Sequence, residues 1–252
     1  MSTSAANAGV NFADGSRPAA RYFLLWQFRR TMHVFNDTTD KYFSDVLVPY
    51  VNELGIGPVG VFQSWFGKES LSGSYALLPC DSAEPLIDLN ARLERMPGYL
   101  EKSAKYRGTV NGDPPFVRLS SSLLKSFDRL PGINVPSQMR GNSNRIFELR
   151  TYAQPTIAAH ESKVSMFESE EAAVLENFGF HAVFYARNLV GENLPCLTYM
   201  WVYESLDSRQ KAEEKFFAAP AVRALFSDPK YASSLTSTID CVILRPAACS
   251  QI

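Results

Sequence analysis

The chain has 252 residues, and its 25 lysines and arginines against 26 aspartates and glutamates give a net charge of −1. This balance leaves no basic surface of the kind that nucleic acid binding requires. Hydrophobic residues make up 46% of the chain and charged residues 20%, a globular composition that excludes bulk disorder. No apolar run approaches the roughly 18 residues of a membrane span.

The first twenty residues are small and polar and contain one arginine, Arg17. They have neither the apolar core of a secretory signal nor the several arginines of a mitochondrial transit peptide. We therefore expect residues 1–20 to be a disordered tail and the protein to be cytoplasmic. The four cysteines form no CxxC pair and are expected to be reduced thiols.

The histidines suit no metal site, because no two of them have chelating spacing and no HExxH occurs. We expect neither a metal nor another cofactor. The three histidines are His33, His160 and His181.

The first half of the chain begins with an aromatic and aliphatic stretch, residues 21–30, that predicts a strand. Apolar residues then recur with a helical period from Phe35 to Leu54, and Gly55 suits a left-handed helix end. The remaining elements expected in this half are strands at 59–66, 74–78 and 116–121, and a helix that begins near Asp81 or Ser82 and is broken at Pro97.

The second half repeats this order about 122 residues later, which is the most informative feature of the sequence. For example, Trp26-Gln27-Phe28-Arg29 is similar to Phe147-Glu148-Leu149-Arg150. The expected elements are strands at 145–152, 180–186, 196–204 and 238–245, a helix that ends at Gly179, and a helix that begins near Ser205 or Asp207 and is broken at Pro220.

Each half therefore has the order β-α-β-β-α-β, the ferredoxin-like motif, whose helices cover one face of a four-stranded sheet. The other face must be buried, and two such sheets can bury their faces against each other. We predict an α+β fold of two tandem ferredoxin-like halves, residues 21–124 and 145–252, that form one pseudo-dimeric barrel. Residues 125–144, with two prolines and two glycines, are the expected linker.

One glycine motif is rejected as a nucleotide site. Residues 55–60 fit GxGxxG, but a dinucleotide fold needs a strand before this turn and a helix after it. Here a helix precedes and a strand follows, and Pro58 removes one N–H donor. The motif is interpreted as a helix end followed by a tight turn.

Residues 145–152, RIFELRTY, resemble the opening strand of the NIPSNAP family. Supporting pieces follow in order: Asn177-Phe178-Gly179, Leu197-Thr198-Tyr199-Met200, Glu204-Ser205-Leu206, Arg209 and Leu244-Arg245-Pro246. The resemblance covers residues 145–252 and extends more weakly to 22–124 through the repeat. It implies tandem NIPSNAP-like domains and the dimeric α+β-barrel superfamily. The first half departs from the pattern, since Gln27 replaces the acidic residue.

Strand alternation suggests which side chains could carry chemistry. Phe147 and Leu149 are expected to face the helices, and Glu148, Arg150 and Tyr152 to face the barrel lumen, where Glu148 could act as a general base. The candidate catalytic residues are Glu148, Arg150 and His181; the candidate substrate-binding residues are Arg29, Gln27, Arg118, Tyr152, Tyr185 and Tyr199.

Several interpretations remain open. Glu148 and Arg150 could simply pair with other buried charges, because structural ion-pair networks mimic active sites. A lumen pocket would suit a cofactor-free isomerase, cyclase or monooxygenase acting on a small hydrophobic metabolite. A filled lumen with an exposed apolar patch would suit a non-catalytic binding or interaction protein. A haem enzyme would need His160 or His181 on the cavity wall. Edge strands could also support a homodimer.

Overall fold

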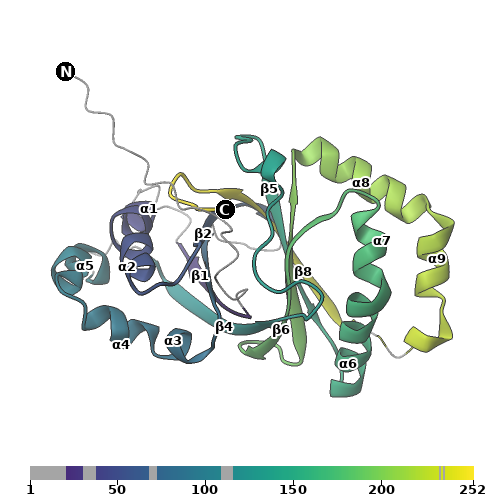
Figure 1. Cartoon of the computed structure of the whole chain (residues 1–252), viewed down its shortest axis with the longest axis horizontal. Helices are drawn as coiled ribbons and strands as arrows, with labels where there is room; N and C mark the ends of the chain where they lie inside the picture. The colour runs from purple at the N-terminus through teal and green to yellow at the C-terminus, as the bar shows by residue number, and fades with distance from the viewer. Residues whose placement is uncertain (1–20, 31–37, 68–72, 109–115, 233, 235) are drawn as a thin grey trace.

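The computed structural model describes residues 21–30, 38–67, 73–108, 116–232, 234 and 236–252 (Figure 1). The expected tail at 1–20 and His33 lie outside the described residues. The strands are β1 (Tyr22–Arg29), β2 (Gly60–Gly67), β3 (Gly73–Cys80), β4 (Arg118–Ser126), β5 (Ile146–Ala153), β6 (His181–Val190), β7 (Cys196–Tyr203) and β8 (Thr238–Pro246).

The helices follow the expected order in both halves. The first half has α1 (Thr38–Tyr42), the π-helix η1 (Phe43–Leu47), α2 (Val48–Glu53), α3 (Glu84–Ile87), α4 (Leu89–Glu94) and α5 (Tyr99–Arg107). After the 3₁₀ turn η2 (Ser137–Met139), the second half has α6 (Ile157–Met166), the π-helix η3 (Phe167–Glu171), α7 (Ala172–Glu176), α8 (Leu206–Ala218), α9 (Pro220–Phe226) and the 3₁₀ turn η4 (Pro229–Tyr231).

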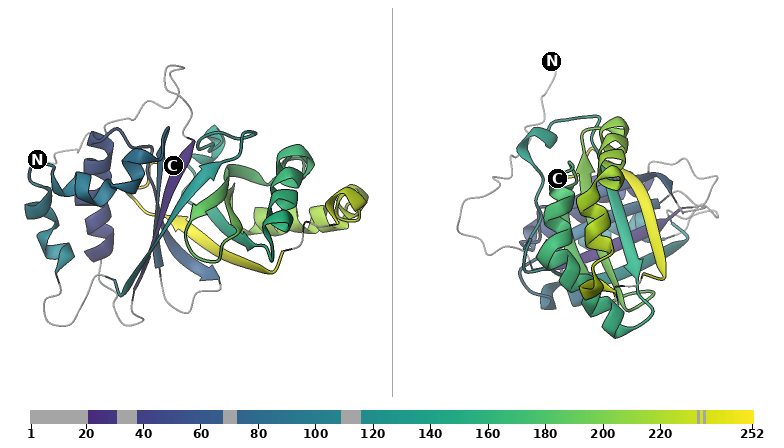
Figure 2. Two further views of the ribbon diagram at one scale, coloured as in Figure 1. Left: turned by 90° about the horizontal axis from the view of Figure 1, so that it is seen from below. Right: turned by 90° about the vertical axis from the view of Figure 1, so that its right-hand side faces the viewer.

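The eight strands form one closed antiparallel barrel in the order β1-β3-β2-β8-β5-β7-β6-β4. The strand order within the first half, β4-β1-β3-β2, is the same as β8-β5-β7-β6 within the second. The pairs β2–β8 and β4–β6 join the halves. The helices of the two halves cover opposite outer sides of the barrel (Figures 1 and 2). The predicted barrel of mixed helices and strands is thus confirmed.

Most of the local signals are confirmed at their residues. Gly55 and Gly179 end helices with φ of +78° and +90°, which glycine adopts without strain. Pro97 lies between α4 and α5, and Pro220 begins α9. The side chain of Ser205 accepts a hydrogen bond from the Ser208 N–H and so caps α8.

Two expectations at helix and strand ends are wrong. Neither Asp81 nor Ser82 caps the helix after β3, because α3 begins at Glu84 behind Ala83, which offers no side-chain oxygen. The last strand of the first half, β4, starts at Arg118 and runs on to Ser126, beyond the expected end at residue 121. It continues because its last residues pair on both sides, with β1 and with β6, a partner from the other half.

The buried side chains form layers on both faces of the barrel wall. The lumen layer takes residues from both halves, among them Phe23, Phe62, Phe147 and Phe184. Separate layers pack under the helices of the first half and of the second. The segment between β4 and β5 and the end of the chain close one end of the barrel, where Val135, Met139 and Ile252 join the lumen cluster. No helix among the described residues is long and apolar enough to cross a membrane.

Candidate functional site

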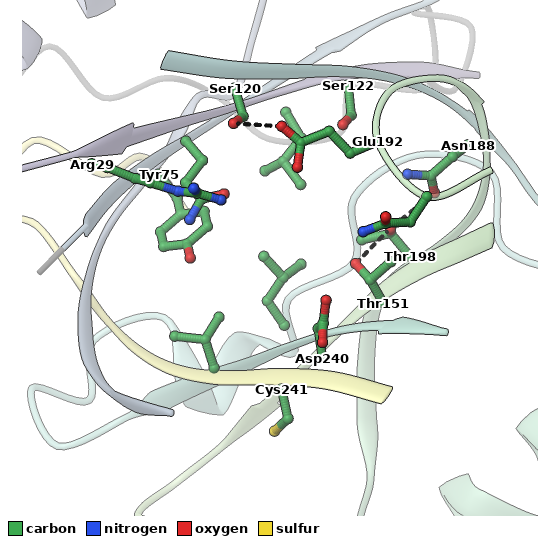
Figure 3. A pocket seen from close by; sticks show the side chains of 15 residues that line it. Arg29, Tyr75, Ser120, Ser122, Thr151, Asn188, Glu192, Thr198, Asp240 and Cys241 are labelled. Atoms are coloured by element: carbon green, nitrogen blue, oxygen red, sulfur yellow. Dashed lines mark hydrogen bonds between the residues drawn. The ribbon is translucent and has the colours of Figure 1, made fainter. Parts of the chain in front are cut away.

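The lumen changes from apolar to polar along its strands. On β1 the lumen side chains run from Phe23 to Gln27 and Arg29, and on β5 they run from Phe147 to Thr151. The polar end holds a cavity of about 410 Å³ (Figure 3), within the usual range for small-molecule sites. It is lined by Leu25, Gln27, Arg29, Tyr75, Ser120, Ser122, Leu149, Thr151, Asn188, Glu192, Asn193, Thr198, Asp240, Cys241 and Val242.

Two hydrogen-bonded groups order the polar wall. Thr151 and Thr198 pair across β5 and β7 with their hydroxyl oxygens 3.0 Å apart, and Thr198 donates to Asn188 Oδ1 at 2.8 Å. At the mouth, Ser120 donates to Glu192 at 3.2 Å. Because these side chains come from both halves, the cavity exists only when the barrel is closed.

Opposite charges stand on different walls of the cavity. Arg29 and Tyr75 project from one side, and Asp240 projects from β8 across from them, below the two threonines (Figure 3). Among the described residues the guanidinium of Arg29 makes neither a hydrogen bond nor an ion pair, although the residue is partly buried. A partly desolvated, unpaired guanidinium is a binding group for a carboxylate, phenolate or enolate oxygen.

The rim of the cavity depends on a glycine. Gly191, between β6 and β7, has φ of +150°, and a Cβ placed there would lie 2.6 Å from the Ser122 hydroxyl oxygen. Only glycine allows the backbone to approach β4 this closely. The approach brings Glu192 to its contact with Ser120.

The predicted orientation of the opening strand of the second half is wrong. Phe147 and Leu149 pack in the lumen, whereas Glu148 and Arg150 point to α8 and Tyr152 packs in the helix-facing layer of that half. Both faces of a barrel strand covered by helices are buried, so alternation separates the two faces without saying which one is the lumen.

The predicted alignment of the opening strands of the two halves, β1 and β5, is also wrong. Leu25 pairs with Leu77 and Ser122, and Leu149 pairs with Met200 and Val242, so Leu25 and Leu149 hold the same place in the strand order. The places of Glu148 and Arg150 are therefore held by Leu24 and Trp26, not by Gln27 and Arg29.

The charged residues between the second-half sheet and α8 form a closed network. Glu148, fully buried, accepts hydrogen bonds from Arg150 Nε at 2.6 Å, from Arg209 Nε at 2.8 Å and from Cys241 Sγ at 3.1 Å. Glu213 binds both arginines, with 2.9 Å from Arg150 Nη2 and 2.9 Å from Arg209 Nη1. Every charge in the network thus has a partner, as a buried ion cluster requires.

The electrostatics of the network favour an ionised Glu148. Burial by itself raises the pKa of this carboxyl, but the hydrogen bond from Arg209 and the charges of Arg150 and Arg209 outweigh it and hold the pKa below its usual value. Burial also raises the pKa of the Cys241 thiol to about 12, so the thiol is the donor in its contact with Glu148.

The strand that carries Glu148, β5, belongs to a segment that matches a known protein family. Residues 147–251, from the strand that carries Glu148 to the last strand, match the NIPSNAP family. The C-terminal half of the chain is a NIPSNAP domain. The buried ion network described above lies within this NIPSNAP domain, and the cavity is lined by the NIPSNAP domain and the first half together.

Solved structures share the fold over the whole chain. A proposed monooxygenase from Lactobacillus acidophilus aligns with a TM-score of 0.56 and 10% identity, covering 90% of this chain and 94% of its own. A proposed monooxygenase from Fusobacterium nucleatum gives 0.55 and 10%, covering 91% and 93%. An anthrone oxidase-like protein gives 0.53 and 12%, covering 90% and 91%. No protein with a curated description matches the chain.

The other predicted site residues are divided between the two faces. Gln27 and Arg29 line the cavity. Tyr185 and Tyr199 do not; they pack under the helices of the NIPSNAP domain, where burial raises the pKa of both phenols. Arg118 is exposed and lies outside the cavity lining, and within the described part of the chain its side chain donates only to the Val117 carbonyl. His181 begins β6 and lies outside the lining.

The sequence reasoning missed most of the polar wall. Thr151, Asn188, Thr198 and Asp240 come from four different strands and form no sequence motif. Alternation along β5 could have indicated Thr151 once the lumen face of that strand was known.

The described residues contain no group of three His, Cys, Asp or Glu side chains able to hold a metal ion. His160 lies on α6, where its Nδ1 contacts Gln154 Oε1 at 2.9 Å, and burial lowers its pKa. It does not line the lumen cavity, and neither does His181, so the wall histidine that a haem enzyme needs is not found among the lining residues. All four cysteines are free, and Cys196 is buried.

Proposed function

We propose that the protein is an enzyme that acts on a small hydrophobic metabolite in the polar end of the barrel lumen, without a resident cofactor. The reaction classes that suit the cavity are isomerisation, cyclisation and oxygenation, each of which can begin with loss of a proton from carbon. The observation that carries the proposal is that Arg29, whose guanidinium has no partner among the described residues, faces Asp240 across a cavity of about 410 Å³.

The lining assigns a role to each wall. Arg29 and Tyr75 would hold a carbonyl or phenolic oxygen of the substrate and stabilise negative charge there. Leu25, Leu149 and Val242 would pack against its carbon skeleton. The Asp240 carboxylate, on the opposite wall, would accept the proton as general base.

The site rests on a pseudo-symmetric chain, which we infer to be two tandem ferredoxin-like domains, residues 21–124 and 145–252. The shared strand order and the paired π-helices η1 and η3 support this inference. The segment 125–144 would then be the linker, its first residues completing β4. In this arrangement Glu148 and Arg150 hold the second domain together rather than contact substrate.

The test uses an anionic aromatic probe, 8-anilino-1-naphthalenesulfonate, titrated by fluorescence. R29M should weaken probe binding about tenfold, the effect of losing one charge-assisted hydrogen bond of about 1.4 kcal/mol. R118M is the matched control, since Arg118 pairs with Arg29 in the strand register but lies outside the cavity lining. Equal affinities of the two variants would reject the cavity as the anion site.

Catalysis is tested separately from binding. Wild-type protein and D240N are incubated with a metabolite extract, and consumed or newly formed masses are compared. D240N should still bind the probe but should form no product, because the amide cannot accept the proton. Product formation by D240N at the wild-type rate would remove Asp240 from the proposed mechanism.

A non-catalytic binding protein is the second candidate. It is favoured by exposed apolar side chains beside the cavity mouth, Leu189, Val190 and Leu194, which are 41%, 59% and 48% exposed. This candidate predicts a retained small molecule in the native mass spectrum and no difference in product formation between wild type and D240N.

A further inference from the structure

A second cavity lies in the first half, on the outer face of the barrel and separate from the lumen. It has a volume of about 420 Å³ and lies between the sheet and the helices α1, α4 and α5. Its described lining is Trp26, Phe28, Thr39, Tyr42, Asn90, Glu94, Tyr99, Tyr106, Arg107, Gly108, Phe116 and Leu119. Six of these twelve residues are aromatic, so half of the lining can contact the rings of a flat molecule.

The same place in the second half carries different side chains. The sheet residues that line the second cavity are Trp26, Phe28 and Leu119, and the corresponding positions carry Arg150, Tyr152 and Ile239. There Arg150 binds Glu148 and Glu213, and the ring of Tyr152 packs against Phe167 and Tyr199.

The charges at the second cavity are already balanced. Glu94 and Arg107, the two charged residues of its described lining, form an ion pair with each other. The indole N–H of Trp26 is also used, donating to Ser121 at 3.1 Å. A charged ligand would have no free counter-charge among these side chains, so desolvating it would be costly.

Among the aromatic side chains of the wall, two hydroxyl groups lie close together. The hydroxyl oxygens of Tyr42 and Tyr99 lie 3.2 Å apart and share one hydrogen bond, which leaves one of the two O–H groups able to donate. Burial raises the pKa of Tyr42, so its phenol stays neutral and keeps its proton. A hydroxyl or carbonyl oxygen could accept this bond.

We infer that this second cavity binds an uncharged, flat aromatic molecule that carries one hydroxyl or carbonyl oxygen. The aromatic wall binds the rings, and the Tyr42–Tyr99 pair binds the oxygen. The inference does not depend on chemistry in the lumen, because the two cavities share none of their described lining residues.

The experiment uses two neutral probes, N-phenyl-1-naphthylamine and 1-naphthol, and a substitution that fills the cavity from its edge. Leu119 is 40% exposed, so L119W adds volume without disturbing the buried layer. The matched control is I239W, because Ile239 holds the same strand position in the second half and is 52% exposed. Circular dichroism melting confirms that both variants fold.

L119W is expected to weaken binding of both probes at least tenfold, and I239W less than twofold. Y42F should weaken 1-naphthol several-fold while changing N-phenyl-1-naphthylamine less than twofold. The inference is overturned if wild type binds neither probe below 1 mM, if L119W binds both as wild type does, or if R29M, which alters the lumen, removes binding instead.

Discussion

The layers between the sheet and the helices differ in the two halves: one contains a charged network and the other contains apolar side chains at the same strand positions. Under α8, Glu148 and Arg150 point from β5 into a four-charge network with Arg209 and Glu213. At the same strand positions in the first half, Leu24 and Trp26 are buried in an apolar layer. The strand order is therefore compatible with either layer, and the charges in the second half are not required by the fold.

The difference extends to the neighbouring strand. Trp26 donates to Ser121 in the first half, and in the second half Cys241, at the position of Ser121, donates to Glu148. A buried ion cluster constrains geometry more than it adds net stability, because desolvation offsets most of its Coulombic gain. We therefore expect the second-half layer to be sensitive to single changes and tolerant of concerted ones.

Removing the central carboxylate should have the largest effect. E148A leaves the partly buried Arg150 and Arg209 with Glu213 as their remaining anionic partner and should cost about 3 kcal/mol of unfolding free energy, measured by urea denaturation. The double variant E148L/R150W, which installs the first-half side chains, should lose less than E148A. A loss below about 1 kcal/mol for E148A would show that the network is not structural.

Acid should destabilise the second half through the same carboxyl. The pKa of Glu148 is lower in the folded protein than in the unfolded chain, so its stabilising contribution is complete above the unfolded pKa, about 4.3. That contribution is lost as the pH falls from there through the folded pKa. Unfolding free energies measured from pH 6 to pH 2 should fall less steeply for E148Q than for wild type. Parallel curves would assign the acid sensitivity to other carboxyls.

The N-terminal caps of α8 and α3 differ between the two halves, with a smaller expected effect on stability. Ser205 caps α8 through a reciprocal bond with Ser208, whereas the residue before α3 is Ala83, with no side-chain bond. S205A should cost about 1 kcal/mol in thermal or urea unfolding. S82A, the control in the first half, should change stability by less than about 0.5 kcal/mol because it removes no cap. Equal costs would mean that the capping bond contributes nothing.

The smallest effect is expected at Cys241. C241S keeps a donor toward Glu148, because a hydroxyl donates to a carboxylate at least as well as a thiol does. Stability should stay within about 0.5 kcal/mol of wild type, whereas C241A, which removes the donor, should lose about 1 kcal/mol. The two melting temperatures, compared side by side, test whether the donor or the sulfur matters.

The fold followed from the sequence because its signals repeat. Gly55 and Gly179 end corresponding helices, and Pro97 and Pro220 fall at corresponding helix breaks. Each signal has a local cause in backbone conformation, so it can be recognised without knowledge of the partner strands. The barrel itself followed from the need to bury the free face of each sheet.

The candidate site followed only in part, for two physical reasons. Alternation on β5 identifies two faces but does not assign them when both are buried, so the sequence predicts Glu148 in the lumen and gives no signal for Thr151. Aligning the halves by residue type also shifted β1 against β5 by an odd number of positions, which exchanges the faces. Arg29 and Gln27 reach the cavity nonetheless, through their own strand's alternation.

The closed end of the barrel has a consequence for substrate entry and product release at the proposed site. Val135, Met139 and Ile252 pack into the lumen cluster at the end away from Arg29 and Asp240. The lumen is then closed at one end, and a molecule that enters at the β6–β7 rim must leave through the same opening. Product that leaves and substrate that enters would compete for this single opening, so turnover would slow as product accumulates.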